Sequence, residues 1–141
     1  MARIVVGVDG SEPAARALRR AVEEARLRAA KLAVVHVVPE PIIIAEPAWV
    51  PPPPRDEVRA AALEVIDEML AGMDLEGVRI ERMAIIGNVA RELCGLAEGA
   101  DLLVVGSRGL GGFRGLLVGS VTQQVVAHSP CPILVVVPEK R

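Results

Sequence analysis

The stretch VGSRGLGGFRGLLVGS, residues 105–120, carries six of the thirteen glycines in the chain, together with Arg108 and Arg114. The apolar run DLLVV at residues 101–105 leads into it, and the run SVTQQVVAH at residues 120–128 follows it with helical character. A strand, a glycine-rich loop and a helix start in this order suit a phosphate group, because glycines let backbone N–H groups approach an anion and a helix start presents unpaired N–H groups. The two arginines also favour an anionic ligand.

A purely structural interpretation of this loop is also available, in which the glycines form an ordinary connection and Gly119-Ser120 an ordinary helix start. The apolar strand before the loop and the helix after it favour binding. The chain contains no Gly-Lys-Ser/Thr triplet of a Walker A loop, and its glycines do not open directly into a helix as the GxGxxG dinucleotide fingerprint requires. The pattern therefore indicates a nucleotide site without the usual hydrolytic groups.

The composition favours one α/β domain over residues 1–141. Apolar residues make up 52 % of the chain and are mostly aliphatic, with one Trp, one Phe and no Tyr. This bias is typical of parallel strands that helices cover on both faces. A net charge of −2 and the lack of aromatic stacking platforms argue against nucleic-acid binding. No apolar run approaches the roughly 20 residues of a membrane span, so we expect no membrane partner and a cytoplasmic location.

Hydrophobic periodicity predicts five strands that alternate with four helices. The predicted strands are residues 4–8, 32–38, 78–85, 101–105 and 133–137. The predicted helices are residues 11–30, 55–72, 88–98 and 120–128. We expect the first helix to turn Leu18, Val22, Ala25 and Ala29 toward the core. The alternation is that of a doubly wound α/β domain, in which ligands bind beyond the carboxyl ends of the strands, here near Asp9, Val37 and Gly106.

Residues 39–54 interrupt this rhythm with several prolines, and they contain the only tryptophan, Trp49. A loop of this length inside a compact domain is often a lid or a binding loop. A tolerated surface insertion is the alternative.

The two cysteines and two histidines do not indicate a metal centre. Cys94 and Cys131 lack the spacing of metal ligands, and we expect both to be small buried hydrophobic residues. His36 and His128 lie in unrelated contexts, so no zinc site is predicted.

Four segments of the chain resemble the universal stress protein family. They are RIVVGVDGS at residues 3–11, VVHVV at 34–38, the pattern Gly106-x-x-Gly109-(nine residues)-Gly119-Ser120, and SPCPILVV at 129–136. The resemblance covers essentially the whole chain. It implies a parallel sheet with strand order 3-2-1-4-5 and, for members that keep the glycine pattern, ATP binding by a homodimer.

The resemblance also implies roles for individual residues at an ATP site. Asp9 would lie near the phosphates or their divalent ion, and Val37 near the adenine. The residues implied around the ribose and phosphates are Gly106, Arg108, Gly109, Gly119, Ser120 and Val121. Because a lone carboxylate repels phosphates unless a cation lies between them, we expect Asp9 to bind Mg²⁺ and nucleotide binding to depend on that ion. A turn that caps the next helix is the alternative role for Asp9.

The last predicted strand lies at an edge of the sheet in the implied order, yet its sequence, ILVVV at residues 133–137, is entirely apolar. An apolar edge without a protecting charge tends to aggregate unless another chain covers it. We therefore expect an antiparallel, two-fold dimer through this strand. The alternative is an interior-like strand beneath two helices.

Three functions are open at this point. The first is an ATP-binding regulatory or stress-response protein that acts as a nucleotide-dependent homodimer with little or no hydrolysis. The second is a slow Mg-dependent ATPase or phosphotransferase, which is disfavoured because the glycine loop has no lysine and no obvious base for water. The third is a module that binds AMP, another adenylate or a protein partner without ATP.

Overall fold

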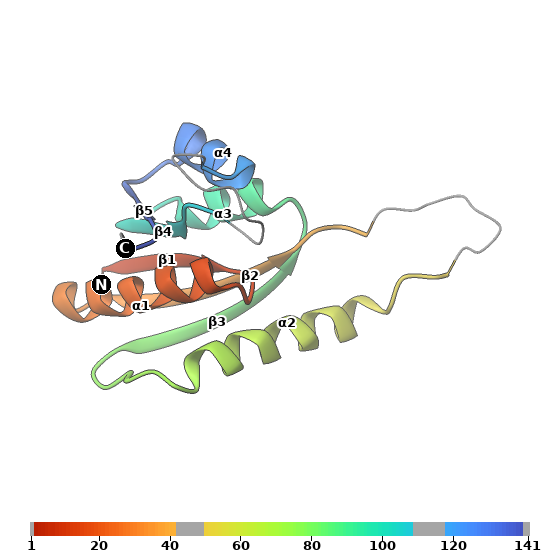
Figure 1. Ribbon diagram of the computed structural model, residues 1–141, viewed down its shortest axis with the longest axis horizontal. Coiled ribbons are helices and arrows are strands. Elements are labelled where there is room, and N and C mark those ends of the chain that lie inside the picture. Colours follow the sequence, from red (N-terminus) through yellow and green to blue (C-terminus); the bar gives the residue numbers. More distant parts are fainter. Residues whose placement is uncertain (1, 42–49, 109–117, 140–141) are drawn as a thin grey trace.

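The structure is a computed structural model that describes residues 2–41, 50–108 and 118–139. Within these ranges, five parallel strands form one sheet in the order β3-β2-β1-β4-β5 (Figure 1). The strands are β1 (Arg3–Val8), β2 (Lys31–Val38), β3 (Arg79–Ile86), β4 (Leu102–Gly106) and β5 (Ile133–Val136). The helices are α1 (Glu12–Arg28), α2 (Arg55–Leu70), α3 (Val89–Ala97) and α4 (Ser120–His128). The predicted fold class and strand order are confirmed.

Helices cover both faces of the sheet, which explains why its central strands are mainly apolar. Ile4, Val6 and Val8 of β1 pack with α1 and α2 in one core, while the intervening Val5 packs with α3 and α4 in the other. Strand β1 pairs in parallel with β2 on one side and with β4 on the other. A strand enclosed in this way has no solvent-facing side, so a polar residue within it would be buried without compensation.

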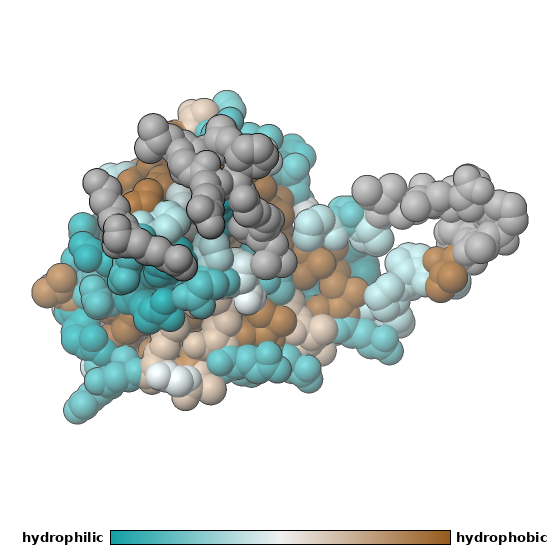
Figure 2. Space-filling model, viewed as in Figure 1, coloured by the Kyte–Doolittle hydropathy of each residue, from teal (hydrophilic) through white to brown (hydrophobic). Residues whose placement is uncertain are grey.

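Helix α1 ends earlier than the periodicity predicts. Ser11 caps its start, with the side-chain oxygen accepting a hydrogen bond from the Ala14 N–H at 3.3 Å. At its end, Ala29 adopts a left-handed conformation with φ of 50°, and the Ala30 N–H donates to the Ala25 carbonyl at 2.9 Å. The expectation that Ala29 faces the core is therefore wrong, because this turn leaves it exposed. The outer face of α1 is charged and gives a hydrophilic surface (Figure 2).

The two edge strands differ in polarity. Strand β3 carries Arg79, Glu81 and Arg82 in its first half, and its Glu81 carboxylate lies 2.9 Å from the Lys31 ammonium of β2. The hydrogen bond from Lys31 lowers the pKa of Glu81. Strand β5 is apolar and only half-buried, and it ends at Val136, one residue before the prediction. Val137 beyond it is 63 % exposed.

Cys94 and Cys131 are half-buried, which corrects the expectation that both are buried. On α3 the fully enclosed positions are Ala90, Leu93 and Ala97, so Cys94 lies at the rim of the buried face. Burial raises the pKa of the Cys94 thiol, and the nearby Cys131 raises it further. Trp49 and the rest of 42–49 lie outside the described residues.

Two features are absent from the described part of the chain. It contains no group of three or more His, Cys, Asp or Glu side chains placed to hold a metal ion. None of its helices combines the length and apolar character of a membrane span.

Gly106 allows the first turn of α1 to approach β4, and this contact predicts a loss of stability in Gly106→Ala. A Cβ at position 106 would lie 3.0 Å from the backbone oxygen of Pro13, an atom that cannot rotate away. We expect urea unfolding to show a loss of about 1–3 kcal/mol, the usual cost of overpacking. Gly95→Ala is the matched control, since a Cβ there meets no atom within 4 Å. It should gain up to about 1 kcal/mol because alanine favours a helix interior. Equal stability of Gly106→Ala and the native protein would contradict this packing argument.

Candidate functional site

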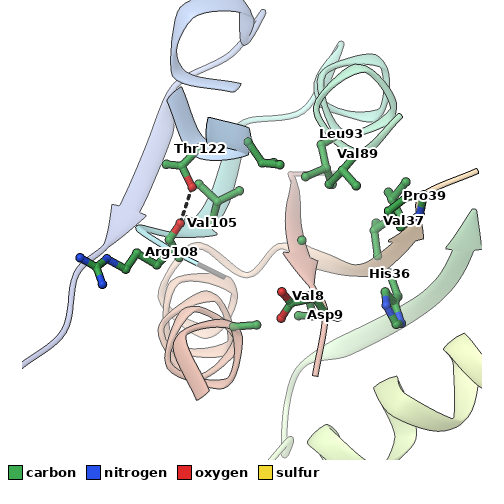
Figure 3. A pocket seen from close by; sticks show the side chains of 15 residues that line it. Val8, Asp9, His36, Val37, Pro39, Val89, Leu93, Val105, Arg108 and Thr122 are labelled. Atoms are coloured by element: carbon green, nitrogen blue, oxygen red, sulfur yellow. Dashed lines mark hydrogen bonds between the residues drawn. The ribbon is translucent and has the colours of Figure 1, made fainter. Parts of the chain in front are cut away.

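A cleft of about 400 Å³ opens at the carboxyl ends of β1, β2 and β4. Its lining includes Val8 at the end of β1, Asp9 directly after it, Val37 near the end of β2 and Val105 of β4 (Figure 3). Gly106, the last residue of β4, also lines it. The strand order reverses at β1, because the chain leaves β1 toward β2 on one side while β4 pairs with it on the other. Ligands of doubly wound domains bind at such a reversal.

Asp9 reaches this cleft with one carboxylate oxygen already engaged. Its Oδ1 accepts hydrogen bonds from the backbone N–H of Ser11, at 2.9 Å, and from the Ser11 hydroxyl. Gly10 between them has a φ of +87°, which a side chain would strain. Ser11 rather than Asp9 therefore caps α1, and Asp9 in turn holds the Ser11 hydroxyl. This arrangement leaves Oδ2 of Asp9 for a cation or a ligand hydroxyl.

Hydrogen bonds attach the start of α4 to the end of β4. The Thr122 hydroxyl donates to the Gly106 carbonyl at 2.7 Å (Figure 3). The Gly119 N–H donates to the Ser107 carbonyl at 2.8 Å, and Ser107 itself is buried. These bonds close the base of the glycine-rich loop. They also use the Gly119 N–H within the protein, so that group is not free to bind an anion.

The structure brings five of the eight residues implied at an ATP site into this cleft. The lining residues among them are Asp9, Val37, Gly106, Arg108 and Val121. Gly119 and Ser120 stand at the start of α4 beside Val121 but do not line the cleft. Gly109 lies outside the described residues.

Arg108 lines the cleft, and in Figure 3 its side chain extends away from Asp9 and His36. Among the described residues, the other ionisable side chains that line the cleft are those of Asp9 and His36.

Sequence reasoning missed His36 and the wall formed by α3. The His36 Nδ1 lies 3.3 Å from the Ala62 carbonyl of α2, and a carbonyl only accepts, so this nitrogen carries the proton. A polar residue inside the apolar run VVHVV, next to Val37, was the available signal. Leu93 of α3 faces Gly7 of β1, where a Cβ would lie 2.9 Å from a Leu93 methyl carbon. Nothing in the sequence indicates this contact, because it depends on how α3 crosses the sheet.

The fold and the position of the cleft define a doubly wound α/β domain with a ligand crevice at its strand-order reversal. Residues 1–137 match the model of the Universal stress protein family. The chain therefore belongs to the universal stress protein family, as predicted. A universal stress protein of Thermus aquaticus is 38 % identical to it over 138 residues, covering 94 % of this chain and 96 % of the relative.

Two solved structures of similar proteins contain adenine nucleotides. A universal stress protein in complex with cAMP is 30 % identical, with a TM-score of 0.68 and coverage of 96 % of both chains. The universal stress protein from Archaeoglobus fulgidus in complex with dAMP is 25 % identical, with a TM-score of 0.62, covering 96 % of this chain and 97 % of the other.

The bond between Thr122 and Gly106 predicts different effects for two substitutions at position 122. Thr122→Val keeps the shape of the side chain but leaves the Gly106 carbonyl without its donor, and we expect a loss of about 1–2 kcal/mol. Thr122→Ser keeps the hydroxyl and should lose less. Urea unfolding of both variants measures the difference. If Thr122→Val were as stable as Thr122→Ser, the hydrogen bond would not hold α4 in place.

Proposed function

We propose that this chain is an ATP-binding regulatory or stress-response protein that takes ATP with Mg²⁺ into the cleft, acts as a homodimer and hydrolyses little or no nucleotide. The observation that carries the proposal is the meeting of Asp9, Val37, Gly106 and Val121 at one cleft where the strand order reverses. Crevices in that position hold nucleotides in doubly wound domains. The relatives solved with cAMP and dAMP add support, because both ligands are adenine nucleotides.

The residues of the cleft suggest how a nucleotide would lie in it. Val37, Val89 and Val105 provide apolar surface for the flat base. The free Oδ2 of Asp9 suits Mg²⁺, which would bring negatively charged phosphates close to a carboxylate. The N–H groups of Ser120, Val121 and Thr122 have no acceptor within α4, because they belong to its first turn, and they suit phosphate oxygens. Gly106, Arg108 and Gly109 would flank the ribose and phosphates.

The position of His36 supports binding rather than hydrolysis. A base that activates water must lie within hydrogen-bonding reach of the attacked phosphate. His36 and Thr122 lie at opposite ends of the cleft (Figure 3). The His36 Nδ1–H is also engaged by the Ala62 carbonyl. An imidazole held at the α2 end would not reach phosphates at the start of α4.

AMP or another adenylate with few phosphates is the second candidate ligand. The ligands named for the solved relatives, cAMP and dAMP, are both monophosphates. A ligand with one phosphate also carries less negative charge than a triphosphate, so it needs fewer cationic partners in the cleft.

Substitution of Asp9 tests both the nucleotide and the ion. Nucleotide-free protein is titrated with ATP, AMP and cAMP, each with Mg²⁺ and with excess EDTA, by calorimetry. For the native protein we expect ATP to bind at least about tenfold more tightly with Mg²⁺, or about 1.4 kcal/mol. Asp9→Asn should remove this dependence, because it loses the charge but keeps an oxygen for Ser11.

Three results of this titration would change the proposal. Equal ATP affinity with Mg²⁺ and EDTA in the native protein would show that Asp9 does not act through the ion. Tighter binding of AMP or cAMP than of Mg-ATP would favour the second candidate. No binding at millimolar nucleotide would exclude the function.

We place the homodimer interface at strand β5. It is an edge of the sheet and carries the apolar sequence ILVV. The carbonyls of Pro132 and Val136 accept hydrogen bonds from the backbone at β4. Because the backbone N–H and carbonyl groups of successive residues in a strand point to alternate sides, those of Val135 point away from the sheet. A second copy of β5 could pair with these outward groups across a two-fold axis.

Val135→Pro tests this interface. Proline removes the outward N–H but no bond to β4, a change that edge strands tolerate. We expect the native protein to elute as a dimer in size-exclusion chromatography with light scattering, and Val135→Pro as a monomer with unchanged circular dichroism. Val135→Thr keeps the N–H and the branched side chain, and should remain a dimer. A native monomer at micromolar concentration would contradict the assignment.

A further inference from the structure

A second cavity, of about 380 Å³, adjoins the cleft described above. It lies between the end of β2, the start of α3 and α4. Pro39, Val89 and Val121 line both cavities, so these three residues form the boundary between them. The second cavity is almost equal in volume to the first. A mononucleotide bound in the first cavity would leave this space to solvent.

The polar groups of the second cavity differ from those of the first. Among the described residues, its lining includes the polar Glu40, Asn88 and Gln124 and no Lys, Arg or His. Glu40 is already paired with Arg55 at 3.1 Å. The Asn88 Oδ1 accepts the Arg91 N–H at 3.0 Å, which leaves its NH₂ group as a donor. Gln124 offers both a donor and an acceptor.

This lining suits a neutral polar group better than an anion. Of the described residues that line it, the only charged one that a phosphate would meet is Glu40, whose carboxylate is paired with Arg55. A base edge or ribose hydroxyls could instead bond to the two amides and the carboxylate, while Pro39, Val89 and Val121 provide apolar surface for a ring. The chemistry of the second cavity is therefore that of a nucleoside site.

Val121 links the two cavities at the point where phosphates would lie. It follows Ser120 in the first turn of α4, the segment to which the proposed function assigns the phosphates. A phosphate chain that passes Val121 leads from the first cavity into the second. We infer that the two cavities together bind a dinucleotide, two nucleosides joined through their phosphates, with the adenosine in the first cavity and the other nucleoside in the second. This inference rests on the proposed function.

The test compares the binding of ligands that contain one nucleoside with that of ligands that contain two, using the whole chain. ATP and the diadenosine polyphosphates with two to five phosphates are titrated by calorimetry in the presence of Mg²⁺. We expect at least one of the diadenosine compounds to bind at least about tenfold more tightly than ATP, as one or two additional net hydrogen bonds would give.

Two variants test whether the second nucleoside binds in the second cavity. Gln124→Leu removes the amide of an exposed residue, and Asn88→Asp removes the amide donor but keeps an oxygen that caps α3. Both should keep the native ATP affinity, which confirms that they fold, and both should lose most of the preference for the diadenosine compound.

Each other outcome overturns the inference. If ATP binds but no diadenosine compound binds more tightly, the second cavity is not a nucleoside site, and the proposed function stands. If the preference survives in both variants, the second nucleoside lies elsewhere. If no adenine nucleotide binds at millimolar concentration, the proposed function and this inference fail together.

Discussion

The parallel pairing of β1 with both β2 and β4 is the constraint from which the cleft follows. After β1 the chain continues into α1 on one face of the sheet, and after β4 it leads to α4 on the other face. The two helices start from neighbouring strands and then diverge, so a space opens between their first turns. Asp9 and Gly106 lie beside that space because they follow or end these strands. The site is thus a consequence of strand order, before any side chain is considered.

Much of the fold could be predicted because strands that are buried on both faces of the sheet appear in the sequence as continuous apolar runs. The apolar runs of β1 and β4 admit no polar residue, and α4 begins and ends where its sequence predicts. The end of α1 could not be predicted, because Ala29 turns the chain with a left-handed backbone and without the glycine that normally marks such a turn. The partial exposure of Cys94 was missed for a related reason, since it depends on how far α3 covers the sheet.

The residues of the site that lie at strand ends could be predicted from the sequence. Those whose position depends on how the helices pack could not. Asp9, Val37 and Gly106 line the cleft because the carboxyl ends of neighbouring parallel strands must meet. His36 and Leu93 also line it, but their part depends on α2 and α3, which periodicity places only approximately. The second cavity is hidden for the same reason, as β2, α3 and α4 each contribute a few residues to it.

The glycine motif serves the protein's own structure as well as a ligand. Gly106 lacks a side chain where Pro13 of α1 approaches, and the Gly119 N–H is bonded to Ser107. These contacts hold the starts of α1 and α4 beside the cleft. A ligand that bridges the two helix starts would add to the same contacts and would bind the folded chain alone, which raises the free energy of unfolding as the ligand concentration rises above its Kd. Stability and binding are therefore coupled through one set of backbone contacts.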